Sequence, residues 1–145
     1  MTIHILLADD HQQYRRNLRA SLDAAAGLQV VAEAEDGAAV LQQVRDRTPD
    51  LVLMDVVLPV LSGIEATRHI IADFPGVKVL ALSLHVDRQF VTAILNAGAS
   101  GYVLKDNGIQ ELVRAIRMVA AAVAHNKLMI CPRVEYEVLN DQPPG

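Results

Sequence analysis

The chain has 145 residues, of which 52% are hydrophobic and 21% charged, and its formal net charge is −4. This length and composition predict one globular domain with a real hydrophobic core. No apolar run approaches the roughly 20 residues that cross a bilayer, and the N-terminus lacks a secretory signal, so we expect a cytoplasmic protein without a membrane partner. The negative charge argues against nucleic-acid binding by this segment itself. The single cysteine excludes an internal disulfide.

Short apolar segments alternate five times with segments of helical periodicity. Strands are predicted at Ile3–Ala8, Gln29–Ala34, Leu51–Met54, Val77–Leu82 and Gly101–Leu104. Helices are predicted at about Gln12–Ala25, Ala38–Arg47, Gly63–Phe74, Arg88–Ala97 and Ile109–Ala124. Strict alternation favours an α/β fold, a doubly wound five-stranded parallel sheet with helices on both faces. Residues 125–145 contain three prolines and are interpreted as a linker-like tail after a domain over residues 1–124.

Acidic residues stand at the ends of two predicted strands: Asp9 and Asp10 after the first, and Asp55 after the third. In an open α/β sheet, the functional crevice lies outside the carboxyl ends of the strands. Three carboxylates there repel one another unless a cation or a proton intervenes. The pattern therefore predicts an anionic pocket for a hard divalent cation such as Mg²⁺. An alternative is that one of the first two acids merely caps the helix that begins near Gln12.

Two further polar residues follow strands, Ser83 after the fourth and Lys105 after the fifth. Each alone would be an ordinary turn hydroxyl or a solvated lysine. Together with the acids they form the set that phosphoryl transfer to a carboxylate requires. In such a set the acids hold Mg²⁺, one aspartate is the nucleophile, and the hydroxyl and the lysine face the charge of the transferred oxygens.

In this order the motifs resemble the receiver domain of two-component response regulators over about residues 2–124. The motifs are Leu7-Ala8-Asp9-Asp10-His11, Leu53-Met54-Asp55 with Pro59 and Gly63-Ile64-Glu65-Ala66, Ala81-Leu82-Ser83, and Ala97-Gly98-Ala99-Ser100-Gly101-Tyr102-Val103-Leu104-Lys105-Asp106. Their style resembles the NarL/FixJ-type subgroup, which carries a C-terminal LuxR-type helix-turn-helix. The resemblance implies a CheY-like, flavodoxin-like sheet with strand order 2-1-3-4-5. It also implies that the tail leads toward an output domain outside this chain.

The resemblance assigns a role to each acid. Asp55 would be the phosphoacceptor for a sensor histidine kinase. Asp10, Asp55 and the backbone carbonyl of Val57 would ligate Mg²⁺ directly, and Asp9 would act through a metal-bound water. The domain would catalyse only its own phosphorylation and dephosphorylation, so we do not expect a metabolic enzyme.

The resemblance also implies a switch. Ser83 and Lys105 would contact the phosphoryl group, and Tyr102 would turn between exposed and buried rotamers. Val57 and His85 would tune the lifetime of the phosphoryl group, and the apolar Val57 predicts slow dephosphorylation. An alternative for His85 is a solvated loop histidine without a catalytic role. The full-length protein would control transcription as a homodimer, through the first and fifth helices or the face of the fourth helix, and would reach DNA only through the absent C-terminal domain.

The chain departs from the family pattern at Val60, where a glycine is common, and at Ser62, where an aspartate is common; Ser62 can still cap the third helix. A haloacid-dehalogenase-like phosphatase would need an acid in place of Val57. A flavin module would need a Ser/Thr/Gly-rich loop in place of the acids after the first strand. A stand-alone or phosphorylation-independent interaction module remains an alternative. The histidines His4, His11, His69 and His125 lack metal-ligand spacing.

Overall fold

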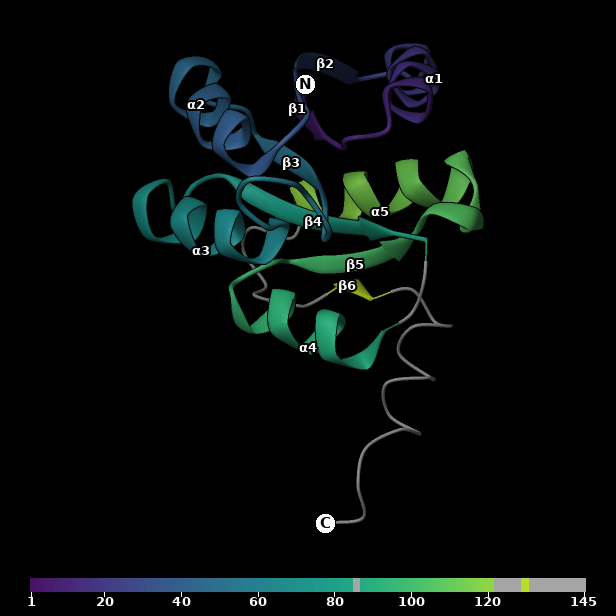
Figure 1. Cartoon of the computed structure of the whole chain (residues 1–145). Helices are drawn as coiled ribbons and strands as arrows, with labels where there is room; N and C mark the ends of the chain where they lie inside the picture. The colour runs from purple at the N-terminus through teal and green to yellow at the C-terminus, as the bar shows by residue number, and fades with distance from the viewer. Residues whose placement is uncertain (85–86, 122–128, 131–145) are drawn as a thin grey trace.

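The computed structural model describes residues 1–84, 87–121 and 129–130 (Figure 1). Strands and helices alternate along the chain. Their bounds are β1 (Ile3–Ala8), α1 (Gln12–Asp23), β2 (Leu28–Ala34), α2 (Gly37–Arg47), β3 (Leu51–Asp55), α3 (Gly63–Asp73), β4 (Lys78–Ser83), α4 (Arg88–Asn96), β5 (Gly101–Leu104), the 3₁₀-helix η1 (Lys105–Asn107), α5 (Ile109–Ala121) and β6 (Met129–Ile130). In the part of the chain that the structure describes, no helix is both long and apolar enough to cross a membrane.

The strands form one parallel sheet in the order β2-β1-β3-β4-β5-β6. The predicted five-stranded arrangement and its order 2-1-3-4-5 are confirmed. The structure adds the two-residue strand β6, whose Met129 and Ile130 pair with Gly101 and Tyr102 of β5. The sequence predicts only a linker-like tail here, because two residues carry no periodicity of their own. The rest of that tail lies outside the described residues.

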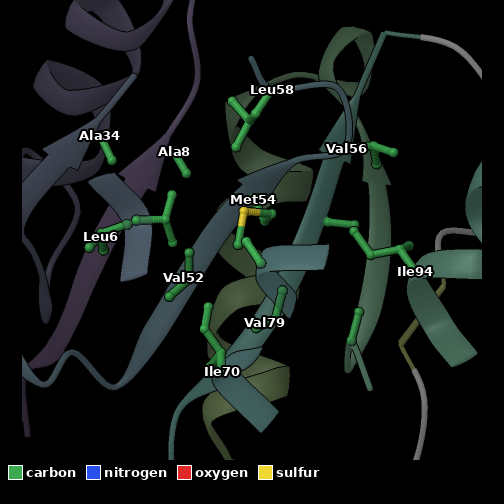
Figure 2. Close-up of a cluster of buried hydrophobic side chains, with 14 of the residues drawn as sticks. Leu6, Ala8, Ala34, Val52, Met54, Val56, Leu58, Ile70, Val79 and Ile94 are labelled. Atoms are coloured by element: carbon green, nitrogen blue, oxygen red, sulfur yellow. The ribbon is translucent and has the colours of Figure 1, made fainter. Parts of the chain in front are cut away.

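The strands carry two hydrophobic layers, because successive side chains of a strand point to opposite faces. One layer combines Leu6 and Val52 with α2, α3 and α4, and Figure 2 shows Met54 within it. The other layer packs Leu7 and Leu53 against α1 and α5. Figure 1 shows these two groups of helices on opposite sides of the sheet. Burial on both faces explains why the strands read as continuous apolar runs.

Side-chain caps fix the starts of three helices. Asp36 caps α2, Ser62 caps α3 through a bond from the Glu65 amide at 3.2 Å, and Asp87 caps α4. The predicted capping role of Ser62 is therefore confirmed. Helix α1 differs, because its N-cap residue is His11, whose side chain makes no capping hydrogen bond. Asp9 accepts from the His11 amide at 2.8 Å but also pairs with Lys105, so the alternative that one of the two acids merely caps α1 is wrong.

Candidate functional site

The sheet register brings the predicted polar residues to one edge. Ala8 pairs with Met54, Asp55 pairs with Leu82, and Ser83 pairs with Leu104. The carboxyl ends of the four central strands are therefore level with one another. The residues that end or follow these strands, Asp9, Asp10, Asp55, Ser83 and Lys105, gather along that edge.

Lys105 lies between two of the carboxylates. Its Nζ is 2.6 Å from Asp9 Oδ2 and 3.2 Å from Asp55 Oδ2. The side chains of Lys105, Asp9 and Asp55 are only 5%, 6% and 10% exposed, so their charges interact with little screening by water. Asp10 is different, because 41% of its side chain is exposed. The site thus has an ion-paired floor and an acidic, accessible rim.

Burial raises the pKa of Asp55 above its usual value, and the neighbouring charge of Asp9 acts in the same direction. The ammonium of Lys105 and a hydrogen bond from the Val57 amide, 3.1 Å from Asp55 Oδ1, oppose this rise. The ionised form of Asp55 is therefore expensive in the absence of a further cation. A divalent cation at the rim would remove that cost and keep Asp55 anionic.

Tyr14 supports Lys105 from α1. The Lys105 ammonium lies 4.5 Å from the centre of the Tyr14 ring, a cation–π distance. Burial, together with the charges of Asp9 and Asp55, raises the pKa of Tyr14 to about 12, so its ring stays a neutral phenol. The contact between Tyr14 and Lys105 is not predicted from the sequence. The available signal was only that Tyr14 shares a helix face with Leu18 and Leu22, which predicts burial but not a partner.

Arg15 forms a second buried contact of α1. Its guanidinium donates to the backbone carbonyl of Asp9 at 2.6 Å, to Glu33 at 2.7 Å and to Glu35 at 3.1 Å. The residue is only 6% exposed. Arg15 therefore ties the turn after β1, which carries the acid pair, to the end of β2. Arg15 stands at i, i+3 and i+7 spacing with Leu18 and Leu22, which is consistent with its burial, but this spacing does not indicate its partners.

The loop after β3 shapes the other wall. Val56 and Leu58 are buried, whereas Val57 is 62% exposed and its amide donates to Asp55. Gly63 begins α3 so close to the site that a Cβ there would lie 2.1 Å from the carbonyl oxygen of Asp55. This close approach requires a glycine. The backbone of this loop shows why a glycine suits position 60: the φ of Val60 is 70°, in the left-handed region that glycine tolerates best.

The side chain of Val60 is 83% exposed. What its branched side chain imposes is backbone strain, since such residues rarely take a positive φ. The Val57 amide faces Asp55, and the ligand role predicted for the Val57 carbonyl stays a prediction. Ser83 is half-exposed at the end of β4. His85, predicted to tune the phosphoryl lifetime, lies outside the described residues.

Tyr102 is fully buried in β5, within the layer that faces α2, α3 and α4. This corresponds to one of the two rotamers that the sequence analysis expected. The exposed rotamer and its link to phosphorylation stay predictions.

The donor set fits a divalent cation. Oxygens of Asp9, Asp10 and Asp55 and the imidazole of His11 each offer an atom within 4.8 Å of the others. Carboxylate oxygens are the ligands that Mg²⁺ prefers. The prediction of an acidic pocket is confirmed. His11 was set aside in the sequence analysis because spacing along the chain shows no ligand pattern, yet its Nδ1 lies 3.3 Å from Asp10 Oδ1.

Comparison with known proteins gives a consistent result. The family model of the response regulator receiver domain matches residues 5–117. The chain is 39% identical over 139 residues to the transcriptional regulatory protein DegU of Brevibacillus brevis, covering 96% of this chain and 57% of DegU. It is 42% identical over 119 residues to the response regulator GacA of Pseudomonas viridiflava, covering 82% of this chain and 56% of GacA. The chain thus spans a little more than half the length of these relatives.

Among solved structures, a two-component response regulator of the LuxR family from Aurantimonas sp. SI85-9A1 superposes with a TM-score of 0.89 at 36% identity. That match covers 97% of both chains. The identity is high enough to support common ancestry as well as a common fold.

Proposed function

The chain belongs to the response regulator receiver family, in its NarL/FixJ-type subgroup, and we propose that Asp55 accepts a phosphoryl group from a sensor histidine kinase. The observation that carries this proposal is the ion-paired cluster in which Lys105 lies between Asp9 and Asp55. A buried carboxylate beside a fixed ammonium offers a nucleophile and a partner for incoming phosphoryl oxygens at one place. The proposed setting for this reaction is the cytoplasm.

In the proposed reaction, a carboxylate oxygen of Asp55 attacks the phosphorus of the donor. A new O–P bond forms as the bond between phosphorus and the donor's histidine nitrogen breaks, and that nitrogen keeps the electron pair. Mg²⁺, held by Asp10, Asp55 and the Val57 carbonyl and through a water by Asp9, would supply charge neutralisation for the phosphoryl oxygens. Lys105 would then exchange its contact with Asp55 for one with a phosphoryl oxygen.

The proposed switch follows from the added charge. A phosphoryl group brings between one and two negative charges and new acceptor oxygens, which Ser83 at the end of β4 and Lys105 after β5 would approach. Movement of the segment after β4 toward the phosphoryl group would change the surroundings of Tyr102 in the neighbouring strand β5. This is a local charge event that biases a two-state element.

The proposed output is transcription control as a dimer, through a helix-turn-helix domain beyond the residue range of this chain. Solved relatives include RcsB dimers bound to DNA, at 22% identity, which here supports the fold alone. Of the two predicted interfaces, the one formed by α1 and α5 gains support from a groove of about 560 Å³ between these helices. Ile109 and Met118 line it and are 38% and 41% exposed.

The test of the proposed function is intact-mass spectrometry after incubation with a small phosphodonor, with and without Mg²⁺. We expect one Mg²⁺-dependent phosphoryl adduct on the wild type and none on Asp55→Asn. Asp73→Asn, which makes the same change at an exposed position at the end of α3, is the matched control and should label normally. Labelling of Asp55→Asn at the wild-type level would refute the assignment of the phosphoacceptor. No adduct on the wild type would favour the phosphorylation-independent interaction module.

A further inference from the structure

A fourth side chain lines the cation side of the acidic cluster. His11 Nδ1 lies 3.3 Å from Asp10 Oδ1 and 3.4 Å from Asp9 Oδ1. We infer that His11 Nδ1 is an additional ligand of the divalent cation, and that through it the site favours first-row transition-metal cations such as Co²⁺ over Mg²⁺. The inference rests on the proposed function in one respect, since it concerns the same cation site.

The distances fit one coordination sphere. For metal–ligand bonds of about 2.1 Å, neighbouring ligands of a tetrahedral ion lie about 3.4 Å apart, and neighbouring ligands of an octahedral ion about 3.0 Å apart. The separation of His11 Nδ1 from Asp10 Oδ1, 3.3 Å, falls in this range. An ion bound by Asp10 could therefore also be bound by His11, while Asp9 keeps its proposed role through a water.

The ion pair with Lys105 leaves this position open. Lys105 contacts Oδ2 of Asp9 and Oδ2 of Asp55, whereas His11 faces Oδ1 of Asp9. The ammonium and the imidazole thus approach different oxygens of the same carboxylate. A cation between Asp10 and His11 would not have to displace Lys105.

The imidazole is also free of a competing structural role in α1. His11 is the N-cap residue, yet its side chain makes no capping hydrogen bond, and its backbone amide donates to Asp9 Oδ1 at 2.8 Å. The side chain is 67% exposed, so its ring can turn to meet an ion that arrives from solvent. The backbone is held in place while the ring remains adjustable.

Ligand chemistry then sets the preference. Mg²⁺ demands a near-octahedral shell of oxygens and usually keeps several waters. Imidazole nitrogen is a better ligand for transition-metal cations, whose affinity for mixed nitrogen and oxygen sites rises along the first row. Three carboxylates alone would serve both classes of cation. Adding one imidazole selectively strengthens binding of the second class.

The experiment is isothermal titration calorimetry of the whole chain with Mg²⁺, with Co²⁺, and with Co²⁺ in the presence of saturating Mg²⁺. The variants are His11→Ala and His11→Gln. The matched control is His4→Ala, because His4 Nδ1 also lies 3.1 Å from a carboxylate, that of Asp50, but belongs to no cluster of ligands among the described residues. The visible absorption of bound Co²⁺ provides a second readout, since its bands respond to replacement of a nitrogen ligand.

We expect Mg²⁺ to compete with Co²⁺ on the wild type. Both His11 variants should bind Co²⁺ about tenfold or more weakly, with altered absorption bands, while their Mg²⁺ affinity changes by less than about threefold. His4→Ala should change neither affinity. Unchanged Co²⁺ binding by His11→Ala would overturn the inference, as would an equal loss of both cations, which would mean that His11 only supports the shape of the pocket.

The two proposals fail in different ways. If wild-type protein binds Co²⁺ through His11 but does not bind Mg²⁺, the inference stands and the Mg²⁺ site of the proposed function is wrong. Mg²⁺ could bind and support labelling of Asp55 while the ratio of the Co²⁺ and Mg²⁺ affinities stays the same in the wild type and in the His11 variants. In that case the proposed function stands and only the inference that His11 is a ligand is wrong.

Discussion

Replacing Gly63 by alanine tests how tightly α3 is packed against Asp55, the proposed phosphoacceptor. A Cβ at this position would lie 2.1 Å from the carbonyl oxygen of Asp55 and 3.0 Å from that of Val56. The first contact must lengthen by more than about 1 Å to reach an ordinary separation. Both obstacles are backbone atoms, and the Gly63 amide itself donates to the Val56 carbonyl at 3.1 Å, so the strain cannot be relieved by a rotamer change.

We expect Gly63→Ala to lower the free energy of unfolding by about 1–3 kcal/mol, the usual range for overpacking. Alanine is the better helix former by about 1 kcal/mol, so a loss of stability would show that the contact outweighs propensity. Displacement of the Asp55 backbone by about 1 Å should slow phosphorylation about 100-fold, because in-line attack depends on orientation. Urea denaturation measures the first effect, and mass spectrometry of the folded protein over time measures the second.

The matched control is Gly76→Ala, in the turn before β4, where a Cβ would meet no atom within 4 Å. Its unfolding free energy should stay within about 0.5 kcal/mol of the wild type, and its labelling rate should be unchanged. Wild-type stability and rate in Gly63→Ala would refute the reasoning, because they would mean that the loop after β3 can yield without moving Asp55.

Three further predictions concern stability. Val60→Gly should raise the free energy of unfolding, measured in urea, by about 0.5–1 kcal/mol, because the strain energy relieved at the positive φ exceeds the entropic cost of ordering a glycine. A lower free energy of unfolding would show that Val60 is not strained. Partial burial raises the pKa of Glu33, but hydrogen bonds from the α1 arginines outweigh this effect and hold the pKa below its ordinary value. The stability that ionised Glu33 contributes to the fold is therefore present above a pH of about 4.5 and is lost as the pH falls through the pKa of the folded state. Glu33→Gln should thus melt below the wild type at pH 7 and approach it in acid; a constant gap would refute this. Lys105→Met removes the main charge that lowers the pKa of Asp55. A carboxyl group whose pKa is raised in the folded state makes the protein less stable as the pH rises. The melting temperature of the variant should therefore fall further below that of the wild type at pH 7 than at pH 4, and Mg²⁺ should restore part of the difference. An Mg²⁺-insensitive melting temperature would argue against that account.

The fold could be predicted from the sequence because each strand and helix has a recognisable local pattern of apolar residues. Apolar strands of four to seven residues, separated by amphipathic helices, allow few arrangements besides a parallel sheet covered on both faces. From β1 to β5, the predicted and observed bounds differ by no more than two residues: β3 includes Asp55, and α1 ends at Asp23 rather than Ala25. These ends depend on hydrogen bonds that periodicity does not report. The short strand β6 was missed for the same reason.

The site was accessible only in part. Strand ends placed Asp9, Asp55 and Lys105 at one edge, since parallel strands share a direction. The contacts of Tyr14 with Lys105 and of Arg15 with the Asp9 carbonyl join residues whose approach depends on how α1 packs against the sheet. No local pattern encodes that packing. A buried arginine in particular contradicts the expectation for its residue type and becomes reasonable only once its three acceptors are known.

The charges of the cluster also imply an order of events. Asp9, Asp10 and Asp55 carry three negative charges when ionised and Lys105 carries one positive charge, which leaves two negative charges uncompensated in a site with a buried floor. That remainder equals the charge of one divalent cation. Without the cation, burial and the charge of Asp9 raise the pKa of Asp55, and the uncompensated negative charges would repel an anionic phosphoryl donor. Under the proposed function, the cation is therefore expected to bind before phosphoryl transfer, and the affinity of the site for the cation would limit how readily Asp55 is phosphorylated.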